Sequence, residues 1–235
     1  MKRVVIVSSV MLVFSFAASA TDYQTWDTFL GYTYTRFGTG NNFVGEPFNL
    51  NVPNFSANGG SAQVGYKFNR WFGVVLDAGA VTSSGGVGHF GNSILFPALS
   101  RGGGLNLTLA NYLLGPRVSF KYGSHFVPYV QTLFGGATAW ESLPVPNAAI
   151  IVPPIAGGGV IIPRGANIRF NRATSGFAMT VGGGLDYKFR KHVYFRPVQA
   201  EYFLTRLSPI GAFGVTNRNN FRYSAGVNFT YGEPR

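Results

Sequence analysis

The sequence contains no cysteine, so no disulfide can hold its fold together. Charged residues make up only 11% of the 235 residues, whereas a soluble domain usually has about 25%. Beyond Phe16 there is also no uninterrupted apolar stretch of the about 20 residues that a transmembrane helix needs. The most apolar segment, Val145 to Pro163, is interrupted by prolines and a glycine triplet. These absences exclude a disulfide framework and a helical membrane domain, and they argue against an ordinary soluble domain.

The first twenty residues have the organisation of a secretory signal peptide. The basic start Met1-Lys2-Arg3 precedes an apolar run from Val4 to Phe16, and the small residues Ala18-Ser19-Ala20 follow. The run is short for a membrane anchor, and the small-x-small pattern marks a cleavage site. The sequence therefore predicts a cleavable signal peptide at 1–20 and an exported β-barrel domain at 21–235.

Glycine and aromatic residues are abundant, with 32 Gly, 22 Phe, 12 Tyr and 3 Trp. Eight segments alternate apolar with small or polar residues, the pattern of a strand with two different faces. In one of them, NFRYSAGVNFTY, every second residue is apolar. The predicted strands cover approximately residues 27–37, 60–68, 71–81, 109–122, 126–138, 175–189, 193–206 and 220–231.

The connections between these strands alternate in length. Strands two and three, four and five, and six and seven are joined by short turns, and the other links are long (38–59, 82–108, 139–174 and 207–219). An even number of strands with short turns at one end and long loops at the other is typical of outer-membrane barrels. In lipid, only helices and closed barrels satisfy all backbone polar groups. The predicted fold is all-β: an eight-stranded antiparallel up-and-down transmembrane β-barrel.

The aromatic and aliphatic face must point outward, because a Lys or Arg at the lipid-facing midplane costs about 2–4 kcal/mol. The opposite face, which is predicted to line the lumen, carries small polar residues together with Asp77, Arg117, Asp186, Glu201 and Arg222. Counting from the turns places Asp77 level with Arg117, and Glu201 level with Arg222, on adjacent strands. Buried charges must be paired. The sequence thus predicts two structural ion pairs in the lumen, Asp77–Arg117 and Glu201–Arg222.

Two questions about the lumen stay open at this point. Arg196 falls on the lipid-facing side by simple alternation, whereas a β-bulge near Pro197 would turn it inward. The internal ion pairs favour a plugged, rigid lumen, and the alternative is a gate or a proton-linked channel.

Several motifs resemble the outer membrane protein β-barrel domain family, which is related to the eight-stranded transmembrane domain of OmpA. The resemblance covers essentially the whole exported chain. It implies residence in the Gram-negative outer membrane and insertion by the barrel assembly machinery, and it implies little about activity. The matching segments are Asn69-Arg70-Trp71-Phe72-Gly73-Val74-Val75, Leu114-Gly115-Pro116-Arg117, Leu133-Phe134-Gly135-Gly136, Phe177-Ala178-Met179, Gly182-Gly183-Gly184-Leu185-Asp186, Arg196-Pro197-Val198-Gln199 and Asn219 to Gly226.

The sequence offers little for catalysis. Its histidines, His89, His125 and His192, fall in predicted turns or loops without the spacing of a metal site or a nucleophilic triad. The glycine triplets lack the Lys-Ser/Thr of a phosphate-binding loop. We therefore predict no enzymatic activity, no catalytic residue, no metal and no cofactor.

Specific interactions are expected in the long loops. The loop after the fifth strand is unusually apolar and is followed by arginines. The apolar residues could form an adhesive surface or an entry for hydrophobic ligands, or could simply pack on each other. The arginines could bind lipopolysaccharide phosphates or be ordinary interfacial charge. The residues concerned are Ile150, Ile151, Ile161, Ile162, Arg164, Arg169 and Arg172.

The preferred function is an integral outer-membrane barrel with a structural or surface-interaction role, a plugged lumen and long external loops. The alternative is a small pore, or an OmpW-like transporter for small or hydrophobic solutes. The expected partners are outer-membrane lipid, lipopolysaccharide and, during insertion, the barrel assembly machinery. A nucleic-acid partner is not expected, because the basic residues behind the net charge of +11 are scattered and the chain is exported.

Overall fold

The computed structural model describes residues 25–38, 42–44, 50–52, 54–83, 89–90, 106–120, 125–144, 150–152, 160–162, 167–169, 173–207 and 217–232. Its long strands are β1 (Trp26–Gly38), β4 (Phe55–Lys67), β5 (Phe72–Thr82), β7 (Asn106–Ser119), β8 (Phe126–Pro144), β12 (Thr174–Arg190), β13 (Val193–Leu207) and β14 (Asn217–Tyr231). Shorter strands are β2 (Asn42–Val44), β3 (Leu50–Val52), β6 (His89–Phe90), β9 (Ile150–Val152), β10 (Val160–Ile162) and β11 (Asn167–Arg169). Across the described residues, no helix is long and apolar enough to cross a membrane.

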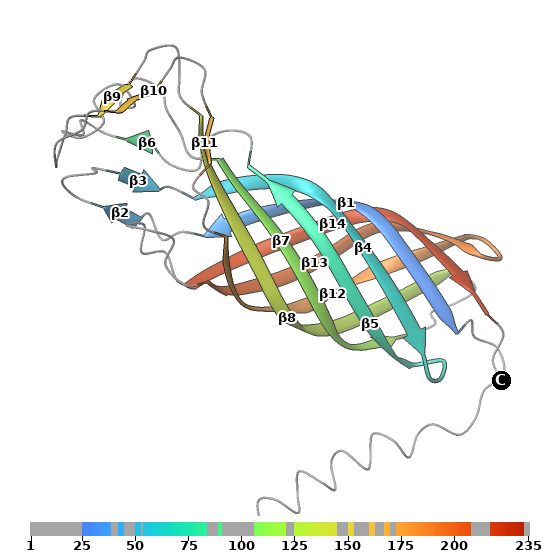
Figure 1. The fold of residues 1–235 in the computed structure, drawn as a ribbon. Helices are drawn as coiled ribbons and strands as arrows, with labels where there is room; N and C mark the ends of the chain where they lie inside the picture. Colours follow the sequence, from blue (N-terminus) through green and yellow to red (C-terminus); the bar gives the residue numbers. More distant parts are fainter. Residues whose placement is uncertain are drawn as a thin grey trace, which may run out of the picture.

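The eight long strands close into a barrel (Figure 1). Each pairs antiparallel with the next long strand along the chain, and β14 returns to pair with β1 from Trp26↔Tyr231 to Gly38↔Asn219. This confirms the predicted eight-stranded antiparallel up-and-down β-barrel. The largest difference in a strand start is in β4, which begins at Phe55 rather than near Gly60.

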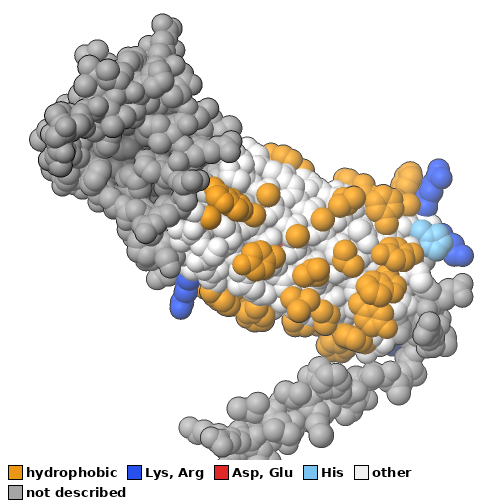
Figure 2. Space-filling model, viewed as in Figure 1, with side chains coloured by type: hydrophobic (Ala, Val, Ile, Leu, Met, Phe, Trp, Pro, Cys, Tyr) orange, Lys and Arg blue, Asp and Glu red, His pale blue; other side chains and the backbone are white. Residues whose placement is uncertain are grey.

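The barrel has an apolar outside and a polar inside. Large side chains such as Leu30, Tyr32 and Leu76 are more than half exposed on the outer face, whereas Asp77 and Gln63 are fully buried. In Figure 2, hydrophobic side chains are spread over the barrel wall and the Lys and Arg side chains in view lie toward its two ends. This inverted arrangement is the one that a lipid environment requires.

The connections alternate as predicted. The links β4–β5 (68–71), β7–β8 (120–125) and β12–β13 (191–192) are short, and the strand ends that they join lie at one end of the barrel. The described strands β2, β3, β6, β9 and β10 belong to the long connections and lie beyond the opposite end (Figure 1). The two ends are called the short-turn end and the long-connection end below.

The glycines of β12 allow its neighbours to come close. A Cβ atom at Gly182 would collide with the carbonyl oxygen of Ala200, and one at Gly183 with the carbonyl oxygen of Tyr129. A Cβ at Gly184 would lie 2.5 Å from the Tyr129 hydroxyl. The missing side chain of Gly184 therefore leaves room inside the barrel for the Tyr129 ring.

Candidate functional site

The acidic side chains that the structure describes in the barrel all point into the lumen. Asp27, Asp77, Asp186 and Glu201 are all buried inside it, and they are all the carboxylates among the side chains that the structure describes. Three buried arginines, Arg117, Arg196 and Arg222, face them. For all of these residues except Arg196, alternation along each strand is the reason, because residues of the same parity share one face of the sheet.

Arg196 points into the lumen and is 0% exposed. The pairing of β13 with β14 shifts between Arg196↔Gly226 and Gln199↔Ser224, so β13 contains one residue more than its partner. The extra residue lies at Pro197, which cannot donate to the strand ladder, and it reverses the alternation on either side. The bulge, which the sequence left as one of two alternatives, is therefore present.

The Arg196 side chain contacts residues of four other strands, β1, β4, β8 and β12. Its Nε and Nη2 atoms donate to Asp186 Oδ1 at 2.6 Å and Oδ2 at 3.0 Å, a bidentate ion pair. Its Nη1 atom donates to Gln63 Oε1, on the other side of the lumen, at 2.9 Å. The guanidinium lies 4.3 Å from the ring centroid of Phe29 and 4.5 Å from that of Tyr129. These contacts combine paired charge with cation–π stacking in a site without solvent exposure.

Arg222 joins two carboxylates from opposite walls. Its Nε atom donates to Glu201 Oε2 at 2.7 Å, and Glu201 is its direct register partner on β13. Its Nη1 atom donates to Asp77 Oδ2, on β5, at 2.8 Å. Gln63 and Asn111 complete the hydrogen bonds of Asp77, at 3.0 Å and 2.8 Å. The structure therefore contains the Glu201–Arg222 pair and extends it across the barrel to Asp77.

The predicted Asp77–Arg117 pair is wrong. Asp77 is the register partner of Leu113, and Arg117 is the partner of Gly73, four residues along the strand. Counting residues from the turns overlooked this offset, which corresponds to about 13 Å of strand. Arg117 instead pairs with Asp27 of β1, at 3.1 Å from its Nη1 atom.

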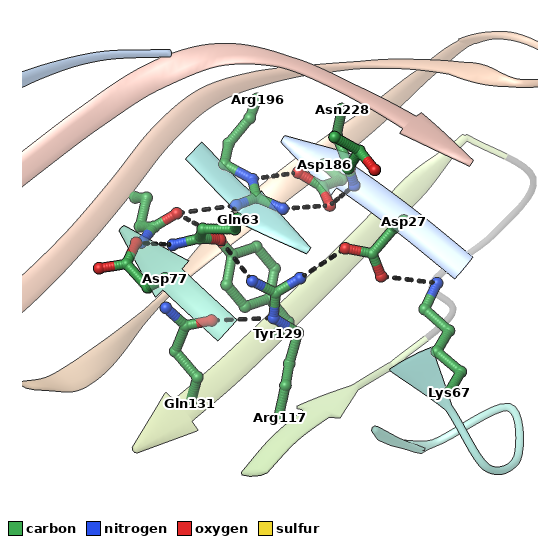
Figure 3. A network of polar contacts seen from close by, with 12 residues as sticks. Asp27, Gln63, Lys67, Asp77, Arg117, Tyr129, Gln131, Asp186, Arg196 and Asn228 are labelled. Carbon is green, nitrogen blue, oxygen red and sulfur yellow. Dashed lines mark hydrogen bonds and ion pairs between the residues drawn. The ribbon is translucent and has the colours of Figure 1, made fainter. Parts of the chain in front are cut away.

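Two glutamines connect the ion pairs into one network (Figure 3). Gln63 Oε1 accepts from Arg117 Nη2 at 2.6 Å as well as from Arg196, while its Nε2 donates to Asp77. Gln131 accepts from Arg117 Nε at 2.8 Å and donates to Glu201 at 2.7 Å. The connected residues, called the lumen network below, are Asp27, Gln63, Lys67, Asp77, Asn111, Arg117, Tyr129, Gln131, Asp186, Arg196, Gln199, Glu201, Arg222 and Asn228.

The charges of the lumen network are balanced by a lysine at the rim. The Lys67 Nζ atom lies 3.8 Å from Asp27 Oδ2, and its side chain is partly exposed at the short-turn end. Three arginines and this lysine thus face four carboxylates. Asp27 was missed as a lumen charge at the sequence level, although its alternation with Phe29, Thr33 and Thr35 was a usable signal.

A second, apolar layer lies in the lumen toward the long-connection end. Phe37 and Phe55 stack with their ring centroids 4.8 Å apart. Both are buried, as are Leu109 and Phe203, which also face inward. The sequence analysis expected a polar lumen and did not predict this layer, because an inward Phe within an aromatic-rich strand carries no distinctive signal.

The loop residues proposed for interactions are only partly described. Ile150, Ile151, Ile161 and Ile162 belong to β9 and β10, which form a hairpin with Ile151 paired to Ile161. Arg169 belongs to β11, where it pairs with Ser142 of β8. Arg164 and Arg172 lie outside the described residues.

The histidines do not form a site in the described part of the chain. His125 and His192 lie in different short turns, and the Nδ1 atom of His192 is 3.0 Å from the carbonyl oxygen of Thr230. Within the described ranges no group of three or more His, Asp or Glu side chains could hold a metal ion. The chemistry that the lumen offers is charge pairing and hydrogen bonding.

Comparison with known proteins supports this description at the level of fold. No protein-family model and no curated protein matches the sequence. The structure is similar to Neisserial surface protein A (NspA), with a TM-score of 0.54, 10% identity, and coverage of 88% of this chain and 97% of that one. Weaker similarities are to Ail of Yersinia pestis (TM-score 0.47, 14% identity, 88% and 100% covered) and to AlkL (0.46, 13%, 93% and 95%). At 10% identity, the likeness to NspA shows the fold alone, and it agrees with the expected resemblance to outer-membrane barrels.

Proposed function

We propose that this integral β-barrel of the bacterial outer membrane has a structural or surface-interaction role, with a lumen closed to solutes and long connections facing outward. One observation carries the proposal: the hydrogen bond of 2.8 Å from Arg222 on β14 to Asp77 on β5, within a network that also links β4 to β13. Bonds of this kind tie opposite walls together at mid-lumen. Eight strands leave an interior just wide enough for such side chains.

Opening the lumen would require these pairs to separate. Removing one partner of a buried ion pair costs about 3–5 kcal/mol, because the other charge stays buried without compensation. The apolar layer of Phe37, Phe55, Leu109 and Phe203 adds a second obstacle for ions on the long-connection side. Both layers support a role that does not depend on transport.

The interaction surface that we propose is the long-connection end, with the β9–β10 hairpin and its isoleucines as one part of it. Outer-membrane lipid and lipopolysaccharide are the partners that we propose for the outer wall. The exposed aromatic residues of that wall support this assignment. A catalytic role has no support from the residues of the lumen network.

Single-channel recording tests the closed lumen. The refolded protein in a planar bilayer should show no steady openings, and Glu201→Ala and Arg222→Ala should each produce openings, because each removes a bond that crosses or braces the lumen. Arg206→Ala, which removes an exposed outward-facing arginine of β13, is the matched control and should remain silent. Steady conductance of the unmodified protein would contradict a closed lumen and favour a small pore.

A further inference from the structure

Among the side chains that the structure describes, the outer surface of the barrel carries one sign of charge. Because all four described carboxylates point into the lumen, the charged side chains described on the outside are cations. At the long-connection end they include Arg36 and Arg206. At the short-turn end they include Arg70, Arg190 and Lys191, whereas Lys188 pairs with Tyr194 in the row of the buried Asn228 and faces the lumen rim. The ion pairs of the lumen do not neutralise these outer cations. Both rims of the barrel therefore attract anions.

The densest group is at the tip of the β12–β13 hairpin, where the sequence is Lys188-Phe189-Arg190-Lys191-His192. These five residues are called the hairpin tip below. Phe189 is 69% exposed, and the guanidinium carbon of Arg190 lies 5.9 Å from the centroid of its ring. In Figure 2, Lys or Arg side chains and a His side chain lie together at the end of the barrel opposite the grey loop region. The tip therefore combines two exposed cations, Arg190 and Lys191, with one exposed aromatic ring.

The hairpin tip lies just beyond an aromatic belt. Tyr187, Phe195, Phe229 and Tyr231 are outward-facing and between 38% and 49% exposed, and they neighbour the tip along β12, β13 and β14. Aromatic residues of barrels gather at the membrane–water interface. Residues immediately beyond them lie at the depth of the lipid headgroups. Short turns of outer-membrane barrels face the periplasm, so the headgroups are those of the inner leaflet.

We propose that the hairpin tip binds the phosphate groups of anionic phospholipids in the periplasmic leaflet. Arg190 and Lys191, both exposed, supply the cations, and Arg190 can donate two parallel hydrogen bonds to one phosphate. Phe189 extends into the boundary between headgroups and acyl chains. A lipid, rather than free phosphate, is the ligand because the exposed Phe189 beside the cations can contact acyl chains, which a free anion lacks.

Lipid counting by native mass spectrometry tests this site. The refolded protein in detergent micelles is titrated with phosphatidylglycerol or phosphatidylcholine. The double variant Arg190→Gln, Lys191→Gln should bind phosphatidylglycerol at least tenfold more weakly, since one interfacial cation contributes about fivefold. Binding of phosphatidylcholine should change little. The matched control is Arg36→Gln with Arg206→Gln, which removes outward cations from the other end and should keep the preference.

A second variant separates lipid from free anion. Phe189→Ser should weaken binding of phosphatidylglycerol while leaving the cations in place, and millimolar inorganic phosphate should not displace the lipid from the unmodified protein. An unchanged lipid preference in the double variant, or full displacement by inorganic phosphate, would overturn the proposal. Migration as the folded form in unheated SDS gels verifies that each variant has its barrel. The result does not depend on whether the lumen conducts.

Discussion

Replacing Arg196 with alanine should lower the free energy of unfolding by about 3–5 kcal/mol. The change removes the bidentate partner of Asp186 and leaves that carboxylate buried, with only the Asn228 amide at 3.1 Å among its described hydrogen bonds. It also removes a donor to Gln63 and leaves a gap between the rings of Phe29 and Tyr129. The measurement is urea unfolding of the protein refolded into lipid vesicles, followed by tryptophan fluorescence.

Two controls isolate the buried charge. Arg206→Ala removes an exposed arginine of the same strand and should change the unfolding free energy by no more than about 0.5 kcal/mol. The double variant Arg196→Met, Asp186→Leu removes both charges and should recover much of the loss, because no buried charge then lacks a partner. Equal losses for Arg196→Ala and Arg206→Ala would show that the lumen network contributes nothing to stability.

Placing an arginine at Leu76 should destabilise the barrel by about 2–4 kcal/mol in a bilayer. Leu76 lies near the middle of β5 (Phe72–Thr82) and is 52% exposed on the outer face. A soluble protein would gain or lose little from a charge at such an exposed position. In a bilayer the introduced arginine side chain would have to enter the hydrocarbon region. The size of the destabilisation therefore tests whether this face of the barrel contacts lipid. Unfolding in vesicles gives the measurement.

The matched control is Thr82→Arg, at the end of the same strand and on the same face. Thr82 is exposed, and its hydroxyl oxygen lies 3.1 Å from that of Thr108. Close to the membrane interface the cost of an arginine falls to about 0–1 kcal/mol. A similar, small effect at both positions would indicate that the outer wall does not contact hydrocarbon and would contradict a transmembrane barrel.

The strands and their faces could be predicted because they depend on local alternation. β5, β8, β12 and β13 begin within one residue of the predicted starts, because a period of two is imposed by the backbone of every strand. The same rule placed Asp77, Asp186, Glu201 and Arg222 inside. It failed at Arg196, where a single extra residue reverses the parity and no sequence pattern fixes whether the bulge forms.

Which charged residues pair inside the lumen could not be predicted by counting residues from the turns. The Glu201–Arg222 pair is local, because these residues are direct register partners across one strand boundary. Arg117, by contrast, pairs with Asp27 three strands away along the barrel wall. Contacts across the lumen depend on the stagger of all intervening strands and on the volume left by glycines such as Gly182, which no single strand encodes.

The eight strands, their antiparallel order and the outward aromatic face could be predicted from the sequence alone, and the structure has all three. Alternation indicated the strands and their two faces, and the alternating connection lengths indicated an up-and-down order. Three features became known only from the tertiary structure. They are which lumen charges pair with each other, the full burial of Arg196 at the centre of one cluster, and the phenylalanine layer on the long-connection side of the lumen network. The physical reason is that closure brings together side chains from nonadjacent strands, and both register and bulges set their heights inside the barrel.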